Sequence, residues 1–178
     1  MAKHAALAVK TAPGMQAWAI GGTLLVALGV RLLEFRGLYG SDDAIYSIRA
    51  LEVAAGLWLP SDYIGALRYG INLPVAAFVT VFGRNEWALA GWGLTCSMAE
   101  LLLVCIFAHR AWGTRAAVFA GLVLAFIPLH IDAATGLIAD APFSAFFTLA
   151  AVLVYSGVTS NQRLTLFWPA SPVERRAG

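Results

Sequence analysis

Charged residues are scarce in this sequence. Asp, Glu, Lys and Arg make up 12% of the 178 residues, about half the share of roughly 25% in a soluble domain. Apolar residues make up 60%, so too few polar side chains are present to cover a water-soluble fold of this size. The net charge is only +2, and the basic residues are scattered rather than gathered in a stripe that could follow a phosphate backbone. The composition therefore excludes a soluble globular enzyme, a disordered chain and a nucleic-acid-binding protein, and it predicts an integral membrane protein.

Cysteine is also rare, and its placement excludes two kinds of site. Cys96 and Cys105 both lie within one apolar stretch, whereas a disulfide framework needs more cysteines in polar loops. The sequence has no Cys-x-x-Cys or His-x-x-x-His spacing, so no metal site is expected. The two cysteines are therefore expected to be small side chains buried in the membrane domain.

Long apolar stretches are what the sequence has instead. A helix needs about 20 mainly apolar residues to cross a bilayer core of about 30 Å. The expected fold is all-α and integral to the membrane, with about four transmembrane helices, at residues 15–33, 87–108, 115–131 and 141–157. Residues 159–178 are more polar and are expected to form a cytoplasmic tail after a membrane domain over 1–158.

The apolar stretch 71–82 does not fit this set, because it is short and carries Pro74. Stretches of that length more often lie at the interface than cross the membrane, so we expect a surface helix over 71–83. If the stretch did cross, every later segment would invert. With a surface helix, seven of the 12 Lys and Arg residues lie inside and five outside, and nearly all acids lie outside. The positive-inside rule therefore favours four spans with an external segment over 34–86.

An acidic pair opens a second amphipathic helix in that external segment. Asp42 and Asp43 begin a helix expected over 42–56, where acids suit the helix dipole and a cap. Asp42, Tyr46 and Arg49 recur at spacings that place them on one face. Two interpretations stay open at this point. The acids only cap the helix and face water, or one of them acts as a general base at the membrane surface.

The segment SDDAIYSIRALEVAAG resembles the first external loop of the GT-C class of polyprenyl-phosphate-sugar glycosyltransferases. This class includes the protein O-mannosyltransferases and the lipid A aminoarabinose transferases. Its Asp-Glu-x-x-Tyr pattern is similar to residues 42–46, with Asp43 in place of the Glu. The resemblance continues in order through RYGINLPVAAFVTVFGRNEWALAGW, AHRAWGTRAAVFAGLVLAFIPLHI and LIADAPFSAFF.

The resemblance implies a reaction and roles for particular residues. A sugar carried on a polyprenyl phosphate moves to an acceptor on the external face, with no nucleotide and no cofactor, and the sequence has no Gly-rich phosphate turn. Whether a divalent ion takes part is left open. Asp42 is the expected general base and Asp43 its support. The lipid phosphate needs positive charge; the substrate-binding residues are expected to be Tyr46, Arg49, Arg68, His130 and Asp140.

Each of three proposed substrate-binding residues also has a purely structural interpretation. Arg68 could simply reach the headgroups, His130 could bond a helix end, and Asp140 could cap the last span. Glu100 lies well inside the second span, so we expect it to bond a side chain of another helix. Asp132 is expected in a plain loop.

The resemblance also implies partners and a location. The expected partners are a polyprenyl-phosphate sugar donor, membrane lipids and an acceptor that is a protein, a glycan or a lipid, with no nucleic acid. The expected location is the plasma (inner) membrane of the cell envelope, with the active site on the extracytoplasmic side. Members of the class continue through further spans, so we expect this chain to be the N-terminal part of such an enzyme and to have little activity alone. Two other functions remain open, a small helical transporter subunit and a non-catalytic membrane scaffold.

Overall fold

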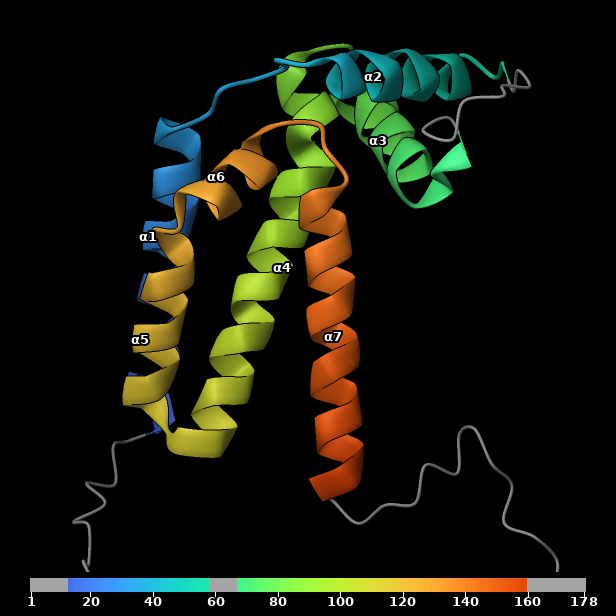
Figure 1. Ribbon diagram of the computed structural model, residues 1–178. Coiled ribbons are helices and arrows are strands. Elements are labelled where there is room, and N and C mark those ends of the chain that lie inside the picture. Colours follow the sequence, from blue (N-terminus) through green and yellow to red (C-terminus); the bar gives the residue numbers. More distant parts are fainter. Residues whose placement is uncertain (1–12, 58–66, 160–178) are drawn as a thin grey trace, which may run out of the picture.

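A computed structural model describes residues 13–57 and 67–159, and helices are the regular secondary structure of these residues (Figure 1). The seven helices are α1 (Pro13–Leu33), α2 (Ser41–Ala54), α3 (Tyr69–Phe82), α4 (Glu86–Trp112), α5 (Thr114–Ala125), α6 (Pro128–Thr135) and α7 (Asp140–Thr159). The polar tail expected at 159–178 lies outside the described residues, apart from its first residue.

Within the described residues, three helices are long and apolar enough to cross a membrane: α1, α4 and α7. The third expected span, 115–131, is divided between α5 and α6, which meet at a bend of 67°. The break has a local cause, because Pro128 lacks an N–H and its ring would collide with the carbonyl of Leu124 in a continuous helix. As the first residue of α6, the same proline is well placed to start a helix. Counting the bent pair as one span gives four, so the predicted fold class is confirmed.

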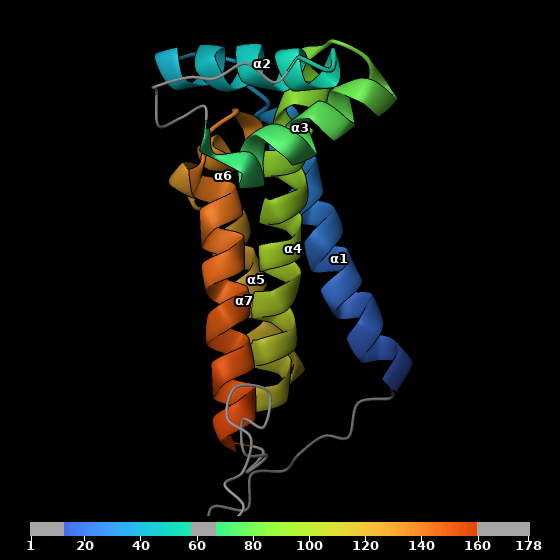
Figure 2. The ribbon, with the colours of Figure 1, turned by 90° about the vertical axis from the view of Figure 1, so that its right-hand side faces the viewer.

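The short helices α2 and α3 lie across one end of the long helices, as two perpendicular views show (Figures 1 and 2). Their bounds agree within two residues with the helices predicted over 42–56 and 71–83. The 14 residues of α3 make a helix of about 21 Å, which is shorter than the bilayer core. Together, α2 and α3 form a layer over one end of the bundle, the end at which α6 lies and α7 begins.

An apolar cluster joins this layer to the bundle. Tyr46 and Ala50 of α2 pack with Val75 of α3 and Leu89 of α4, and all four are buried. The indole N–H of Trp92 donates a hydrogen bond to the carbonyl of Gly70, with 3.0 Å between the two atoms. These contacts fix α2 and α3 relative to α4, and so they fix the helix that carries the acidic pair.

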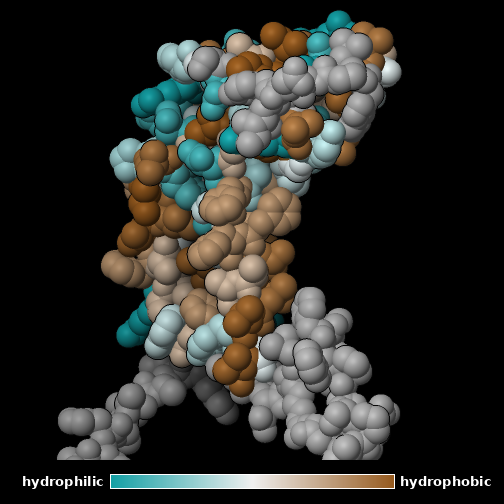
Figure 3. All heavy atoms as spheres, turned by 45° about the vertical axis from the view of Figure 1, so that its right-hand side comes forward, coloured by the Kyte–Doolittle hydropathy of each residue, from teal (hydrophilic) through white to brown (hydrophobic). Residues whose placement is uncertain are grey.

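The long helices pack through small side chains and present large apolar ones outward. Ala27, Cys105 and Ala117 are fully buried between α1, α4 and α5, as expected where helices approach closely in a membrane. Phe119 on α5 and Phe143 and Phe147 on α7 are mostly exposed. In the space-filling view, hydrophobic side chains cover the long helices, whereas hydrophilic ones gather around the α2 and α3 end (Figure 3). This distribution suits helices surrounded by lipid with one end in water.

Candidate functional site

Asp43 is buried and ties three segments of chain together. One carboxylate oxygen accepts hydrogen bonds from the backbone N–H groups of Tyr39 at 2.6 Å and Gly40 at 3.1 Å. The other oxygen accepts from the backbone N–H of Leu137 at 3.1 Å. Asp43 therefore joins the start of α2 to the segment 136–139, which leads from α6 to Asp140.

Asp42 points away from this junction. Successive residues of a helix lie about 100° apart around its axis, so the burial of Asp43 turns its neighbour outward, and Asp42 is exposed. Within 13–57 and 67–159, no hydrogen bond reaches the Asp42 carboxylate. The two acids thus occupy different environments, one held by backbone amides and the other facing solvent.

The phenol predicted beside Asp42 contacts an arginine that immediately precedes the next helix. Tyr46 is buried, and its hydroxyl accepts a hydrogen bond from the guanidinium of Arg68. The same guanidinium lies 5.7 Å from the centre of the Tyr46 ring. Arg68 is the residue immediately before α3 and stays exposed. Arg49 pairs instead with Glu52 of its own helix, at 2.7 Å.

Asp140 lies at the same end of the molecule as Asp43. It is the first residue of α7 and is exposed, and Asp43 binds Leu137 only three positions before it. Asp140 also lines a groove of about 370 Å³ between α5, α6 and α7. Most of the groove's lining is apolar, and His130 and Ser144 are the polar side chains beside Asp140. Two of the predicted site residues, Asp140 and His130, therefore line one groove.

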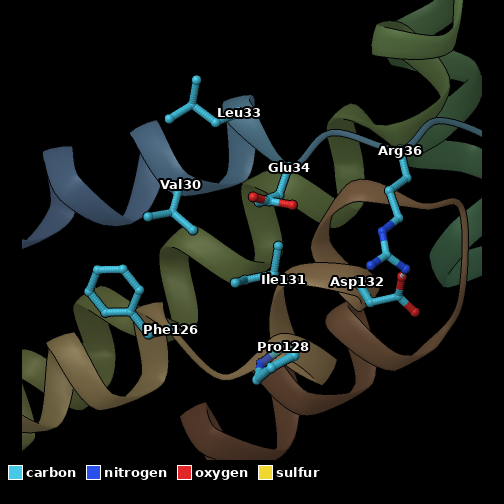
Figure 4. Close-up of a pocket in the computed structure, with 8 residues that line it drawn as sticks. All are labelled: Val30, Leu33, Glu34, Arg36, Phe126, Pro128, Ile131 and Asp132. Atoms are coloured by element: carbon cyan, nitrogen blue, oxygen red, sulfur yellow. Dashed lines mark hydrogen bonds and ion pairs between the residues drawn. The ribbon is translucent and has the colours of Figure 1, made fainter.

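A second groove, of about 340 Å³, opens between the end of α1 and the α5–α6 break (Figure 4). Its polar residues are Glu34, Arg36 and Asp132, and Arg36 forms an ion pair with Asp132 at 3.0 Å. The expectation that Asp132 lies in a plain loop is wrong, because the residue falls within α6. After the bend that ends α5, a new helix begins at Pro128, and Asp132 falls within it.

A buried polar cluster lies beneath this end, between four helices. Arg31 is fully buried and Glu100 is 5% exposed. The guanidinium of Arg31 contacts the Nδ1 atom of His130 at 2.7 Å, and the Nε2 atom of His130 contacts Glu100 at 3.0 Å. The expectation that Glu100 bonds side chains of other helices is confirmed. His130 therefore lies inside the bundle, with both ring nitrogens in contact with charged groups.

Sequence reasoning missed Arg31 as a site residue. The charge count placed it among the external cations, whereas the structure places it at 0% exposure against Ser97 and His130. A signal was available, since Arg31 falls inside the span predicted at 15–33, and a charge within a span is by default a functional candidate. Among the described residues, no group of three or more His, Cys, Asp and Glu side chains could hold a metal ion.

Asp43→Asn is expected to destabilise the protein by about 1–3 kcal/mol. The amide nitrogen of Asn cannot accept a hydrogen bond, so at least one of the three backbone N–H donors loses its partner. A lower midpoint of thermal unfolding in detergent would show this. Asp42→Asn is the matched control. The Asp42 carboxylate is exposed, so this substitution should change the free energy of unfolding by less than about 0.5 kcal/mol. Equal midpoints for the two variants would contradict the role of Asp43.

Searches of curated proteins and of solved structures found no match to the chain. A scan of protein families matches residues 71–171 to the family described as dolichyl-phosphate-mannose-protein mannosyltransferase. The match covers more than half of the chain and begins after Asp42 and Asp43. This chain therefore belongs to the dolichyl-phosphate-mannose-protein mannosyltransferase family.

Proposed function

We propose that the protein transfers a sugar from a polyprenyl-phosphate carrier to an acceptor hydroxyl on the extracytoplasmic face of the plasma (inner) membrane. Membership of the family carries this proposal, because the family implies a glycosyltransferase with a lipid-linked sugar donor. The geometry adds support, because the acidic pair, Arg68 and Asp140 all belong to the end of the bundle covered by α2 and α3. A lipid-linked donor needs a site at such an end, where apolar helices meet water.

The proposed reaction is a displacement at the sugar's anomeric carbon. The acceptor oxygen attacks this carbon, and Asp42 takes the hydroxyl proton as general base. The bond from the anomeric carbon to the phosphate oxygen breaks, and its electron pair leaves with the polyprenyl phosphate. A new glycosidic bond forms with inversion of configuration, so Asp42 must lie on the side of the sugar opposite the phosphate.

The surrounding residues support this step in different ways. Asp43 supports Asp42 by fixing the first turn of α2 through its three backbone contacts. Arg68, oriented by the Tyr46 hydroxyl, supplies positive charge for the leaving phosphate. Arg49 is a second cation on the same helix as Asp42, held by Glu52. The apolar groove beside Asp140 suits part of the prenyl chain.

The direct test is transfer of radiolabelled mannose from polyprenyl-phosphate mannose in membranes that contain the natural full-length gene product. We expect the label to leave the polyprenyl-phosphate fraction and to appear in a protein, glycan or other lipid fraction. Donors that carry other sugars are tested in parallel, because the proposal does not depend on mannose. If no donor loses its label faster than in membranes without the protein, the proposed function is wrong.

The proposed sidedness predicts opposite labelling of the two ends of the bundle. Ile48 on α2 and Trp112 at the end of α4 are 56% and 71% exposed, so a cysteine at either position should react readily. In a Cys96→Ala, Cys105→Ala background, an impermeant maleimide added outside intact cells should label Ile48→Cys and not Trp112→Cys. In inverted vesicles the result should reverse. The Cys96→Ala, Cys105→Ala protein without an added cysteine is the unlabelled control, and labelling of both positions from one side would contradict the topology.

A further inference from the structure

His130 stands between two buried charged side chains, Arg31 and Glu100, and contacts one with each ring nitrogen. A guanidinium has only N–H donors, so the 2.7 Å contact from Arg31 makes the Nδ1 atom of His130 an acceptor. The proton of the neutral ring is then on Nε2, which donates to Glu100 at 3.0 Å. The neutral His130 ring therefore bridges Arg31 and Glu100, because a proton on Nδ1 would face the N–H groups of Arg31. We call this chain of two contacts the Arg31–His130–Glu100 relay.

The remaining polar atoms of both charges are also bonded. The Nε–H of Arg31 donates to the Ser97 hydroxyl at 2.8 Å, and an Nη1–H donates to the carbonyl of Ala27 at 3.0 Å. The second oxygen of Glu100 accepts from the hydroxyls of Ser144 at 2.6 Å and Thr148 at 3.0 Å. A buried network satisfied in this way specifies one arrangement of its helices, here α1, α4, α6 and α7.

α6 needs such an anchor more than its neighbours do. It has only eight residues, too few for a helix to be stable by itself, and it follows a 67° bend. The buried side chains of α6 are small, namely Ala133, Ala134 and Thr135, so its burial of apolar area is limited. His130 is the side chain through which α6 reaches the two buried charges.

The network also lies next to each segment that carries a proposed active-site acid. Arg31 is in the last turn of α1, from which the chain runs to Asp42 and Asp43. His130 is in α6, which leads to Leu137, the backbone partner of Asp43. Ser144 lies one helical turn after Asp140 in α7. A shift of α6 would therefore move the Leu137 amide away from Asp43 and displace Asp140.

We propose that the Arg31–His130–Glu100 relay locks α6 against α1, α4 and α7, and that His130 is thereby a positioning residue for the acids at the outer end of the bundle. The lock itself is a property of the fold. Its effect on sugar transfer rests on the proposed function, because small displacements of a catalytic acid slow a reaction that depends on orientation.

Two substitutions of His130 separate the relay from simple packing. Gln carries an acceptor oxygen and a donor N–H₂ on one planar group, so His130→Gln can still join Arg31 to Glu100. His130→Leu keeps an apolar side chain of similar bulk but removes both contacts. Thr148→Val is the matched control at the same cluster, because it removes one bond to Glu100 and leaves the relay intact.

The experiment measures backbone hydrogen exchange of a peptide covering 136–140, together with kcat and KM for the lipid-linked sugar, in the full-length protein. His130→Leu should speed exchange of this peptide by about tenfold or more. It should also lower kcat by about tenfold or more with KM changed less than about twofold. His130→Gln and Thr148→Val should stay within about threefold of wild type in both measurements.

Each outcome decides the proposal. Wild-type exchange in His130→Leu would overturn the lock, and fast exchange with wild-type kcat would overturn the positioning role. If no form transfers sugar but exchange follows the expected order, the proposed function fails and the lock stands. If His130→Leu does not fold, His130→Asn replaces it. Its amide is one methylene shorter and cannot reach both charges, so exchange as slow as in His130→Gln would overturn the proposal.

Discussion

Asp42→Asn is expected to lower the rate of sugar transfer by about 100- to 10,000-fold. Asn has nearly the same shape as Asp but cannot take the proton of the acceptor hydroxyl, so only binding and phosphate stabilisation would remain. The substitution should leave folding unchanged, because Asp42 is exposed and Asp43, not Asp42, bonds the surrounding backbone. The loss should therefore appear in kcat, with the amount of protein in the membrane as in wild type.

The measurement is transfer of labelled sugar by equal amounts of membrane-inserted wild type and variant. Asp132→Asn is the matched control, because it makes the same chemical change at an exposed acid of the same end, where Asp132 only pairs with Arg36. It should retain transfer within about twofold, since exposed ion pairs contribute little. Full activity of Asp42→Asn would remove Asp42 from the mechanism, and equal losses in both variants would point to a general effect of charge at this end.

The hydrophobic pattern predicted most of the helices because length alone distinguishes them. α1, α4 and α7 exceed the length needed to cross a bilayer, and α3 is too short, so their assignment needed no tertiary information. The α5–α6 break was not predicted. Pro128 was visible near the end of the third apolar stretch, but a proline in that position is also compatible with a span that only kinks. The depth to which α6 folds back depends on its contacts with α1 and α4, which the local sequence does not contain.

The sequence predicted several residues of the candidate site, but not the contacts between them. Helical spacing placed Asp42 and Asp43 at the start of a helix, as α2 confirms. It did not indicate which acid faces inward, because that depends on Leu137, which lies 94 positions further along the chain. The pairing of Arg31 with Glu100 through His130 was also missed, since each residue lies on a different helix. A charge count by segment cannot distinguish one arginine near the end of a span from another. Only the structure shows that Arg31 is buried.

Removing one of the two buried charges is expected to cost far more stability than removing both. In Arg31→Met, Glu100 keeps its burial without a cation, and in Glu100→Gln, Arg31 keeps its burial without an anion. Each single substitution should cost about 3–5 kcal/mol, whereas replacing a buried pair together is often close to neutral. The double variant should therefore be more stable than either single variant, because no uncompensated charge remains inside the bundle.

Thermal unfolding in detergent tests this cycle, with a fall in midpoint of about 10 °C expected for each single variant. The exposed pair of Arg36 and Asp132, at 60% and 49% side-chain exposure, supplies a matched control cycle. Arg36→Met and Asp132→Asn should each shift stability by less than about 1 kcal/mol and add independently. If the costs of Arg31→Met and Glu100→Gln also simply add, the two charges do not interact through His130. In that case the cluster would be separate hydrogen bonds, and the relay could not be what holds α6 in place.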